Sequence, residues 1–359
     1  MGGLKFTRRR LALGALLVLA VALTFGATAA RSSVPGTYTV NDLNSNVSGA
    51  AQQTDPDLVN GWGIVAPPGG PWWVSDNGSD KTTLYNGSGV KQGLVVNILN
   101  GAPTGNVFNG GSGFDVTEGS ASGPARFIFA AESGTISGWN PTVDATNTVE
   151  GVTVPGAVFK GLALATNGGQ QQLYATDFVG GQVDVFNSSW GPGTASGGFS
   201  DPHLPKGYAP FGIANVGGNL VVTFAKQQPG SEDEQHHQGF GVVDLFDSDG
   251  NLLSRIATHG QLNAPWGIAL APAGFGPFSG DLLIGNFGDG QINAYAQNPA
   301  GSWHRAGGLR DSHGRQITID GRWGSGVGND GAAGSSKVLY FAAGPNDEND
   351  GLFGSITAN

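Results

Sequence analysis

Trp62-Gly63-Ile64 is the motif that best predicts the fold, because the chain repeats this phrase along its length. With an aromatic or basic residue before the glycine, it returns as Lys160-Gly161-Leu162, Phe211-Gly212-Ile213, Trp266-Gly267-Ile268 and, more loosely, Trp323-Gly324. The first gap is about twice the others, and a degenerate copy, Gly113-Phe114-Asp115-Val116, fills it. Six units of roughly 50 residues, each rich in short strands, predict an all-β fold, a six-bladed β-propeller.

Each unit predicts a four-stranded antiparallel blade, with turns rich in Gly, Pro, Asp and Asn between its strands. The predicted blades span approximately 60–102, 112–155, 158–205, 208–258, 263–310 and 319–357. The last unit runs out of chain before its outer strand. We expect residues 37–44, which precede the first unit, to supply that strand and close the ring. Residues 31–359 are therefore expected to form a single domain.

The first thirty residues have the pattern of a signal peptide. Four basic residues, Lys5 and Arg8-Arg9-Arg10, precede an apolar run at 11–25 and the cleavage-like triplet Ala27-Thr28-Ala29. The run is shorter than the roughly 20 residues of a bilayer span, so a retained anchor is the alternative reading. The arginines also fit a twin-arginine signal. We expect secretion by the Sec or the twin-arginine route, with no membrane span after cleavage.

The composition narrows the classes of partner. The chain has 17 Lys and Arg against 27 Asp and Glu, and loss of the four basic leader residues leaves 13 against 27, about −14. This charge disfavours nucleic acid and anionic lipid as partners. The chain has no cysteine, which excludes disulfides, thiol nucleophiles and cysteine-bound metals.

Acidic residues are expected to gather on one face of the ring. In an antiparallel meander, the loops from second to third strand share a face with the loops that enter each innermost strand. These two sets of loops hold 16 of the 27 acidic residues. They are Asp55, Asp57, Asp76, Asp80, Glu132, Asp177, Asp201, Glu232, Asp233, Glu234, Asp289, Asp311, Asp320, Asp347, Glu348 and Asp350. Solvated turns account for many of them, but the concentration predicts a face that binds a cation or a polyhydroxylated ligand.

A metal site is one hypothesis for the centre of this face. Asn60, Asn109, Asn263 and Asp320 lie just before innermost strands, and their oxygens suit a hard cation such as Ca²⁺. Asn60, Asn263 and Asp320 are the ligands we single out. The competing interpretation is that these side chains cap the tight turn into each strand.

A second ring of candidates ends the second strands. Glu132 and Asp177 are the candidate catalytic groups, since two carboxylates near a channel can share acid and base roles. Asp76, Lys226 and Asn286 are expected to contact a ligand. The alternative is that such residues accept hydrogen bonds from loop N–H groups.

Two further features carry alternatives of their own. Trp62 and Trp266, with Phe211 and Trp323, could form an aromatic platform for a ligand, or fill the wedge between neighbouring sheets. The insert 227–238 contains acidic residues beside His236 and His237, which fits a transition-metal site or a solvated loop.

The ordered motifs resemble an uncharacterised family of secreted bacterial β-propeller proteins. The resemblance rests on Leu58-Val59-Asn60-Gly61-Trp62-Gly63, Trp73-Val74-Ser75-Asp76-Asn77-Gly78, Pro103-Thr104-Gly105, Gly134-Thr135-Ile136-Ser137-Gly138-Trp139-Asn140, Leu262-Asn263-Ala264-Pro265-Trp266-Gly267 and Gly285-Asn286-Phe287-Gly288-Asp289-Gly290. Members of that family often carry a PEP-CTERM sorting tail, which does not follow the motifs here. The blades also resemble NHL repeats. The family implies no settled activity.

Three functions remain open. The first is a secreted, monomeric propeller that binds a small molecule, polysaccharide or protein through its acidic face. The second, by analogy with other six-bladed propellers, is a Ca²⁺-dependent hydrolase that resembles sugar lactonases. The third is a structural scaffold of the cell envelope.

Overall fold

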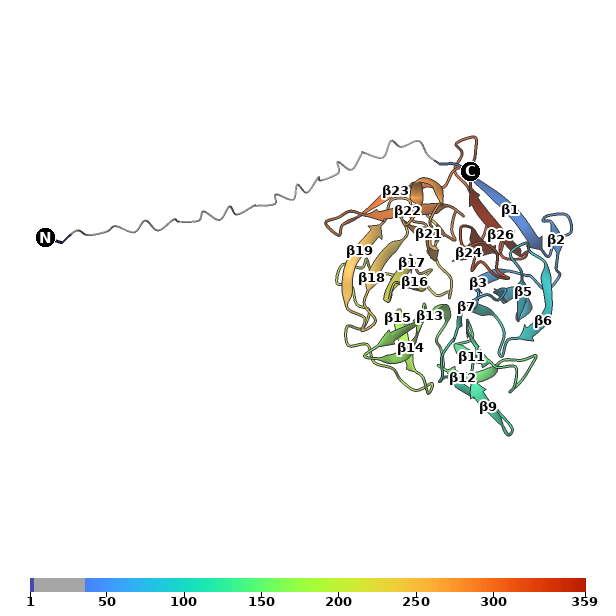
Figure 1. Cartoon of the computed structure of the whole chain (residues 1–359). Coiled ribbons are helices and arrows are strands. Elements are labelled where there is room, and N and C mark those ends of the chain that lie inside the picture. Colours follow the sequence, from blue (N-terminus) through green and yellow to red (C-terminus); the bar gives the residue numbers. More distant parts are fainter. Residues whose placement is uncertain (3–35) are drawn as a thin grey trace. The chain divides into compact units, whose positions relative to one another are not determined.

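Short antiparallel sheets arranged in a ring make up the computed structural model, which describes residues 1–2 and 36–359. Figure 1 shows the six sheets as blades around a central axis. The predicted six-bladed β-propeller is confirmed. The proposed signal peptide lies outside the described residues.

The blades follow one another along the chain, and within each blade the strands run from the axis outward. The first three are β3 (Gly61–Val65), β4 (Trp72–Asp76), β5 (Lys81–Tyr85), β6 (Lys91–Asn97); β7 (Pro103–Phe108), β10 (Phe127–Ala131), β11 (Thr135–Trp139), β12 (Val149–Thr153); and β13 (Phe159–Asn167), β14 (Gln170–Asp177), β15 (Gln182–Asn187). The others are β16 (Tyr208–Val216), β17 (Asn219–Lys226), β18 (Val242–Phe246), β19 (Leu252–Thr258); β20 (Pro265–Leu270), β21 (Leu282–Asn286), β22 (Ile292–Gln297), β23 (Trp303–Gly308); and β24 (Arg322–Val327), β25 (Leu339–Ala343), β26 (Leu352–Ala358). Short 3₁₀ turns follow β4 at η1 (Asn77–Ser79) and precede β21 at η2 (Gly276–Phe278).

The ring closes as expected. Strand β1 (Tyr38–Ser45) pairs antiparallel with β26, from Tyr38 opposite Ala358 to Ser45 opposite Leu352. It thereby completes the sixth blade, and the two-residue β2 (Gln53–Thr54) lies along its outer edge. Strands β1 and β26, from opposite ends of residues 36–359, therefore share one sheet and join the beginning of the domain to its last blade.

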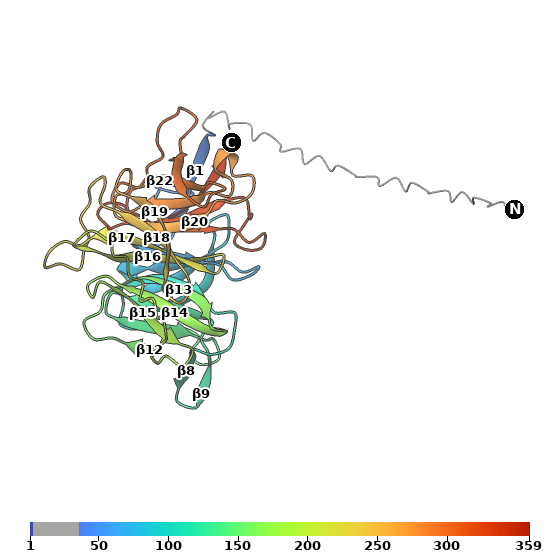
Figure 2. The same cartoon turned by 90° about the vertical axis from the view of Figure 1, so that its left-hand side faces the viewer.

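The second blade differs from the prediction. Its innermost strand is β7, whereas the phrase at 113–116 leads into a separate hairpin, β8 (Asp115–Glu118) and β9 (Ala121–Pro124). This hairpin protrudes at the rim of the ring (Figures 1 and 2). The predicted start of this blade at 112 was therefore wrong, and the true copy of the repeat is Thr104-Gly105, which lacks an aromatic residue.

The repeated glycine has a physical cause at the axis. A Cβ added to Gly63 would lie within 3 Å of backbone atoms of β7, and one added to Gly105 would meet β13 in the same way. Gly161, Gly212, Gly267 and Gly324 likewise each meet the backbone of the next innermost strand. The innermost strands therefore approach around the ring to a distance that only glycine permits.

Buried apolar clusters fill the space between neighbouring blades. Trp73 and Leu84 of the first blade, for example, pack against Phe127 and Phe129 of the second. A corresponding cluster packs between the two blades of each remaining neighbouring pair, including the sixth and the first. One further cluster lies at the axis itself.

Candidate functional site

The axis of the ring is filled by aromatic side chains, most of them from the repeated phrase. The rings of Trp62 and Trp323 stack with centroids 3.5 Å apart, and Phe287 stacks on Trp323 at 3.7 Å. Trp266 meets Trp62 edge-on at 6.0 Å. These residues come from the first, fifth and sixth blades, so they meet at the centre. They form one buried cluster at the axis, here called the aromatic floor, in place of separate wedges between pairs of neighbouring sheets.

Lys160 takes the aromatic position of the phrase in the third blade. Its side chain is only 3% exposed, and its ammonium lies 5.2 Å from the centre of the Trp62 ring. It pairs with the carboxylate of Glu132. Burial opposes the charge of Lys160, but the attraction of Glu132 outweighs it and raises the pKa of the lysine. The ammonium is thus held charged on the aromatic floor.

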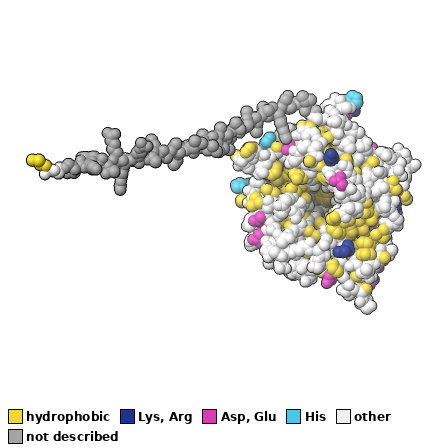
Figure 3. Space-filling model, viewed as in Figure 1, with side chains coloured by type: hydrophobic (Ala, Val, Ile, Leu, Met, Phe, Trp, Pro, Cys, Tyr) yellow, Lys and Arg dark blue, Asp and Glu magenta, His cyan; other side chains and the backbone are white. Residues whose placement is uncertain are grey.

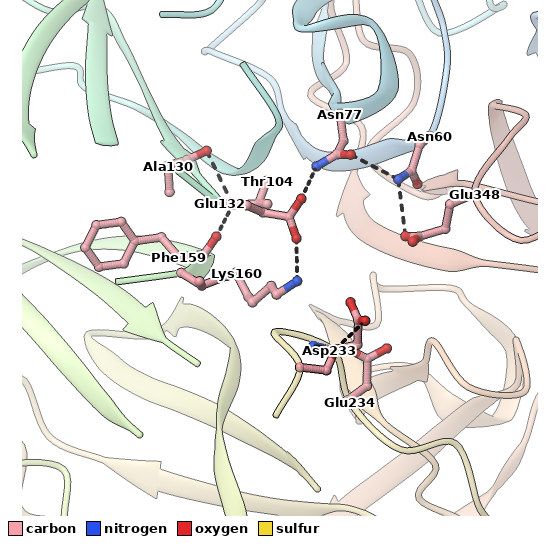
Figure 4. A network of polar contacts seen from close by, with 12 residues as sticks. Asn60, Asn77, Thr104, Ala130, Glu132, Phe159, Lys160, Asp233, Glu234 and Glu348 are labelled. Carbon is pink, nitrogen blue, oxygen red and sulfur yellow. Dashed lines mark hydrogen bonds and ion pairs between the residues drawn. The ribbon is translucent and has the colours of Figure 1, made fainter. Parts of the chain in front are cut away.

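Two amides extend this ion pair across the mouth of the channel (Figure 4). Asn77 donates from Nδ2 to the second oxygen of Glu132 at 3.1 Å. Asn60 donates from Nδ2 to Asn77 at 3.2 Å and to Glu348 at 3.2 Å. The indole N–H of Trp323 donates to Asn60 Oδ1, which fixes the orientation of that amide. The chain of contacts therefore links Lys160 of the third blade to Glu348 of the sixth through residues of the second and first blades.

The insert after β17 brings a second pair, a carboxylate with an imidazole, to the same mouth of the channel. Glu234 is nearly buried, and its Oε1 lies 2.8 Å from Nε2 of His236. This hydrogen bond raises the pKa of His236. The imidazole also meets the ring of Phe287 edge-on at 5.0 Å, so the insert rests on the aromatic floor.

Glu348 has the most perturbed carboxyl at the mouth. Burial, together with repulsion from Glu234 and Glu132, raises its pKa from 4.5 to about 7. Beside it lies a cavity of about 670 Å³. Its lining residues are Gln228, Asp233, Glu234, Gln235, His236, His237, Phe240, Phe287, Asp347 and Glu348. Four carboxyl groups around the Phe287 ring give this cavity a negative potential. Glu348, with a pKa of about 7, can exchange a proton at neutral pH.

Among the predicted catalytic residues, only Glu132 lies in this network. Asp177 ends β14 and accepts hydrogen bonds from the backbone N–H groups of Val158 and Gly180, at 3.0 and 2.9 Å. It holds the loop in place, as the competing interpretation anticipated.

The predicted ligand-contact residues other than the tryptophans lie apart from the network. Asn286 is fully buried and donates to the carbonyl of Gln261 at 2.8 Å and to Asp289 at 2.9 Å. The ammonium of Lys226 lies 4.2 Å from the centre of the Phe240 ring, at the border of the acidic cavity. Asp76 is fully buried within the first blade, and burial holds its pKa well above its usual range.

Each predicted metal ligand is held by contacts of its own. Asn60 Oδ1 accepts from Trp323, and Asp320 Oδ2 accepts from the backbone N–H of Asn346 at 3.0 Å. Asn263 is buried beneath Gly288, where a Cβ would overlap its amide. Asn109 follows β7 rather than preceding it and bonds its own turn. Within 36–359, no group of three or more His, Asp or Glu residues is placed to hold a metal ion.

Lys160, Asn77 and Glu348 are the members of the network that the sequence did not identify as site residues. Lys160 had a signal, since it is a basic residue at a position that is aromatic in four other copies of the phrase. Glu348 was expected only as one of 16 acidic residues on that face, and Asn77 had no signal, because both lie in loops whose proximity depends on the closed ring.

Comparison with known proteins identifies relatives across nearly the whole chain. The uncharacterized protein L690 of Acanthamoeba polyphaga mimivirus is 33% identical over 338 residues, which cover 89% of this chain and 86% of the viral protein. The uncharacterized protein R648 of the same virus is 34% identical over 334 residues, covering 89% and 80%. The chain belongs to the family of these viral proteins. No family model matches it. The relatives are viral, so they do not support the expected secreted bacterial family.

Solved structures with a similar fold are more distant. Virginiamycin B lyase from Staphylococcus aureus has a TM-score of 0.51 and 15% identity, over 90% of this chain and 100% of the lyase. The PQQ-bound aldose sugar dehydrogenase from Streptomyces coelicolor has a TM-score of 0.52 and 14% identity, over 90% and 99%. At these identities the similarity establishes the propeller fold alone. Over the described residues, no helix is both long and apolar enough to cross a membrane.

Proposed function

We propose that the acidic mouth of the channel binds a small organic cation, such as an amine with several N–H donors. The observation that supports this most directly is the state of Glu348, whose pKa is raised by burial and by two neighbouring carboxylates. A bound positive charge would relieve that repulsion and restore the carboxylate. The sequence-based hypothesis of ligand binding at an acidic face is thereby narrowed to one cavity and one class of ligand.

The lining of the cavity fits such a ligand. Glu234 and Glu348 offer carboxylate oxygens, and the Phe287 ring at the base supplies an aromatic surface for the ligand's methylene groups or its charge. The neighbouring Lys160 is already neutralised by Glu132, so it does not cancel the field of the remaining carboxylates. An organic cation is favoured over a metal ion because no three carboxylate or imidazole side chains of the described residues are grouped to coordinate one.

Isothermal titration of the full chain with spermidine tests this proposal. We expect binding that weakens with salt, and a loss of about tenfold in affinity for Glu348→Gln, which removes one charged partner. Glu118→Gln is the matched control, because it makes the same change on the exposed β8–β9 hairpin. Xylitol, which offers hydroxyl groups without charge, should bind much more weakly. If xylitol binds and spermidine does not, the ligand is a polyol and the proposal for a cation fails.

A second candidate is hydrolysis at the same mouth. It is favoured by one observation: a carboxyl with a pKa of about 7 can donate and accept a proton at neutral pH. A screen of lactones and glycosides with the wild type and Glu348→Gln separates this from simple binding. Adding Ca²⁺ after EDTA treatment tests the metal-dependent version. A site saturated a hundredfold above its dissociation constant would raise the free energy of unfolding by about 2.7 kcal/mol.

A further inference from the structure

The opposite mouth of the channel holds a second cavity, of about 460 Å³, between the far ends of the innermost strands. Its walls include Ile64, Val65, Val107, Leu164, Ala214 and Ile268, and Trp266 contributes to its lining. Several of these apolar side chains are half exposed. Figure 3 shows the hollow at the centre of the ring, bordered by hydrophobic side chains. Unlike the acidic mouth, this cavity has no charged residue in its lining.

One point of this apolar wall is backed by a buried cation. Ser325 lines the cavity, and the guanidinium of Arg322 donates to its hydroxyl from behind. Arg322 is completely buried. Its Nε and Nη1 have no hydrogen-bond partner among the described residues. Burial lowers its pKa to about 9. The charge therefore lies one side chain away from the cavity, and no carboxylate within 36–359 is paired with it.

The fifth blade has a space shaped for this guanidinium. In the third blade, Thr176 sits opposite Gly161 on the second strand and accepts from its N–H at 2.7 Å, while donating to Phe211 O at 2.7 Å. In the fifth blade the residue opposite Gly267 is Gly285. A Cβ at Gly285 would overlap Nη1 of Arg322. A cation thus replaces a neutral, fully bonded hydroxyl at this position.

This replacement is costly unless something balances the charge. A buried ion without a partner loses its hydration without compensation, at several kcal/mol. The same wall places Nη1 of Arg322 and Oγ of Ser325 at 2.9 and 3.1 Å from a Cβ built on Gly267, between the two cavity-lining residues Trp266 and Ile268. Rotation of the Ser325 side chain would open a route from the cavity to the guanidinium.

We propose that this second cavity binds a small amphipathic anion, with its carboxylate at Ser325 and Arg322 and its apolar tail along the channel mouth. The free N–H groups of the guanidinium match a carboxylate. The half-exposed aliphatic walls match a short alkyl or aryl chain. The site is independent of the acidic mouth, which lies on the other side of the aromatic floor.

Titration of the full chain with octanoate and with octan-1-ol, which share a chain length, tests the proposal. Octanoate is expected to bind, and octan-1-ol to bind about tenfold more weakly, because it lacks the charge. Arg322→Met should remove this preference. Glu348→Gln should leave octanoate binding unchanged, which separates this site from the proposed amine site. No binding of octanoate, or equal binding of both ligands to the wild type, would overturn the proposal.

A blocking variant keeps the test decisive if Arg322→Met does not fold. Ala214→Phe places a ring in the cavity without altering the arginine, and it should abolish octanoate binding. Val90→Phe makes a comparable change at an exposed position on the outer part of the first blade and should not. Folding of each variant is checked by its near-UV circular dichroism. Octanoate affinity that survives Ala214→Phe in the folded protein contradicts the proposed location.

Discussion

The ammonium of Lys160 is paired with the carboxylate of Glu132, and the lysine side chain is only 3% exposed to solvent. The two residues come from neighbouring blades and meet at the axis of the ring. This pair anchors the polar network at the acidic mouth, and Asn77 and Asn60 connect it to Glu348.

Removing one member of this pair should destabilise the fold. Glu132→Gln leaves a buried ammonium without its counter-charge, and we expect a loss of about 3 kcal/mol in the free energy of unfolding. The double variant Glu132→Gln/Lys160→Met should recover more than half of that loss, because no charge remains buried. Urea denaturation measures both values. Equal stability of wild type and Glu132→Gln would show that the pair does not contribute to stability.

The protonation of Glu348 predicts a pH-dependent stability. Its folded-state pKa is raised from 4.5 to about 7, so the stability it contributes is complete below the unfolded value and is lost as the pH rises through the folded value. We expect the wild type to lose stability relative to Glu348→Gln between about pH 5 and pH 8. Comparing the two proteins cancels the titration of other groups. A difference in unfolding free energy that does not change with pH contradicts this assignment.

The glycines of the repeat should resist substitution. In Gly212→Ala the new methyl would meet the carbonyl oxygen of Trp266 in the next blade, and we expect a loss of about 3 kcal/mol or more. Gly93→Ala is the matched control, since β6 is an outer strand and no atom lies within 4 Å of the added Cβ. Its effect should stay within about 0.5 kcal/mol. Similar losses for both variants would mean that close approach of the innermost strands is not the cause.

The closing strand should stabilise the whole ring. Tyr38 is 1% exposed, its ring packs against Phe275 and Phe278, and its hydroxyl donates to Phe275 O at 3.1 Å. Tyr38→Ala is expected to cost about 3–5 kcal/mol, and Tyr38→Phe about 1 kcal/mol because it removes only the hydrogen bond. Thermal unfolding should remain a single transition in both variants. A separate early transition in Tyr38→Ala would indicate that only the sixth blade depends on β1.

The fold could be predicted from the sequence because the repeated glycine is required in every blade, where the innermost strand lies against the backbone of the next innermost strand. The start of the second blade was predicted wrongly because the glycine that makes this backbone contact there is not preceded by an aromatic residue. Gly105 makes the contact, but Thr104 before it lacks the aromatic ring that marks other copies, and Gly113-Phe114 imitates the phrase without making the contact.

The site was only partly predictable. Glu132 and Asn60 follow from their positions at strand ends that face the channel. Lys160 and Glu348 join them through contacts across the ring, and no local spacing encodes such contacts. Of the predicted metal ligands, Asn60 and Asp320 accept hydrogen bonds from an indole and a backbone N–H group, and Asn263 is buried beneath Gly288, which the sequence does not reveal.

The affinity for spermidine, measured at pH 5.5 and at pH 8, is the most direct test of cation binding at the acidic mouth. A cation at the acidic mouth favours the ionised form of Glu348, so its binding must release protons near neutral pH. We predict that affinity rises several-fold between the two pH values and that the rise is smaller in Glu348→Gln, where His236 of the same cavity, whose pKa is also raised, still loses its charge as the pH rises. An affinity that is the same at both pH values, or absent at both, would contradict the assignment of the acidic mouth as a cation-binding site.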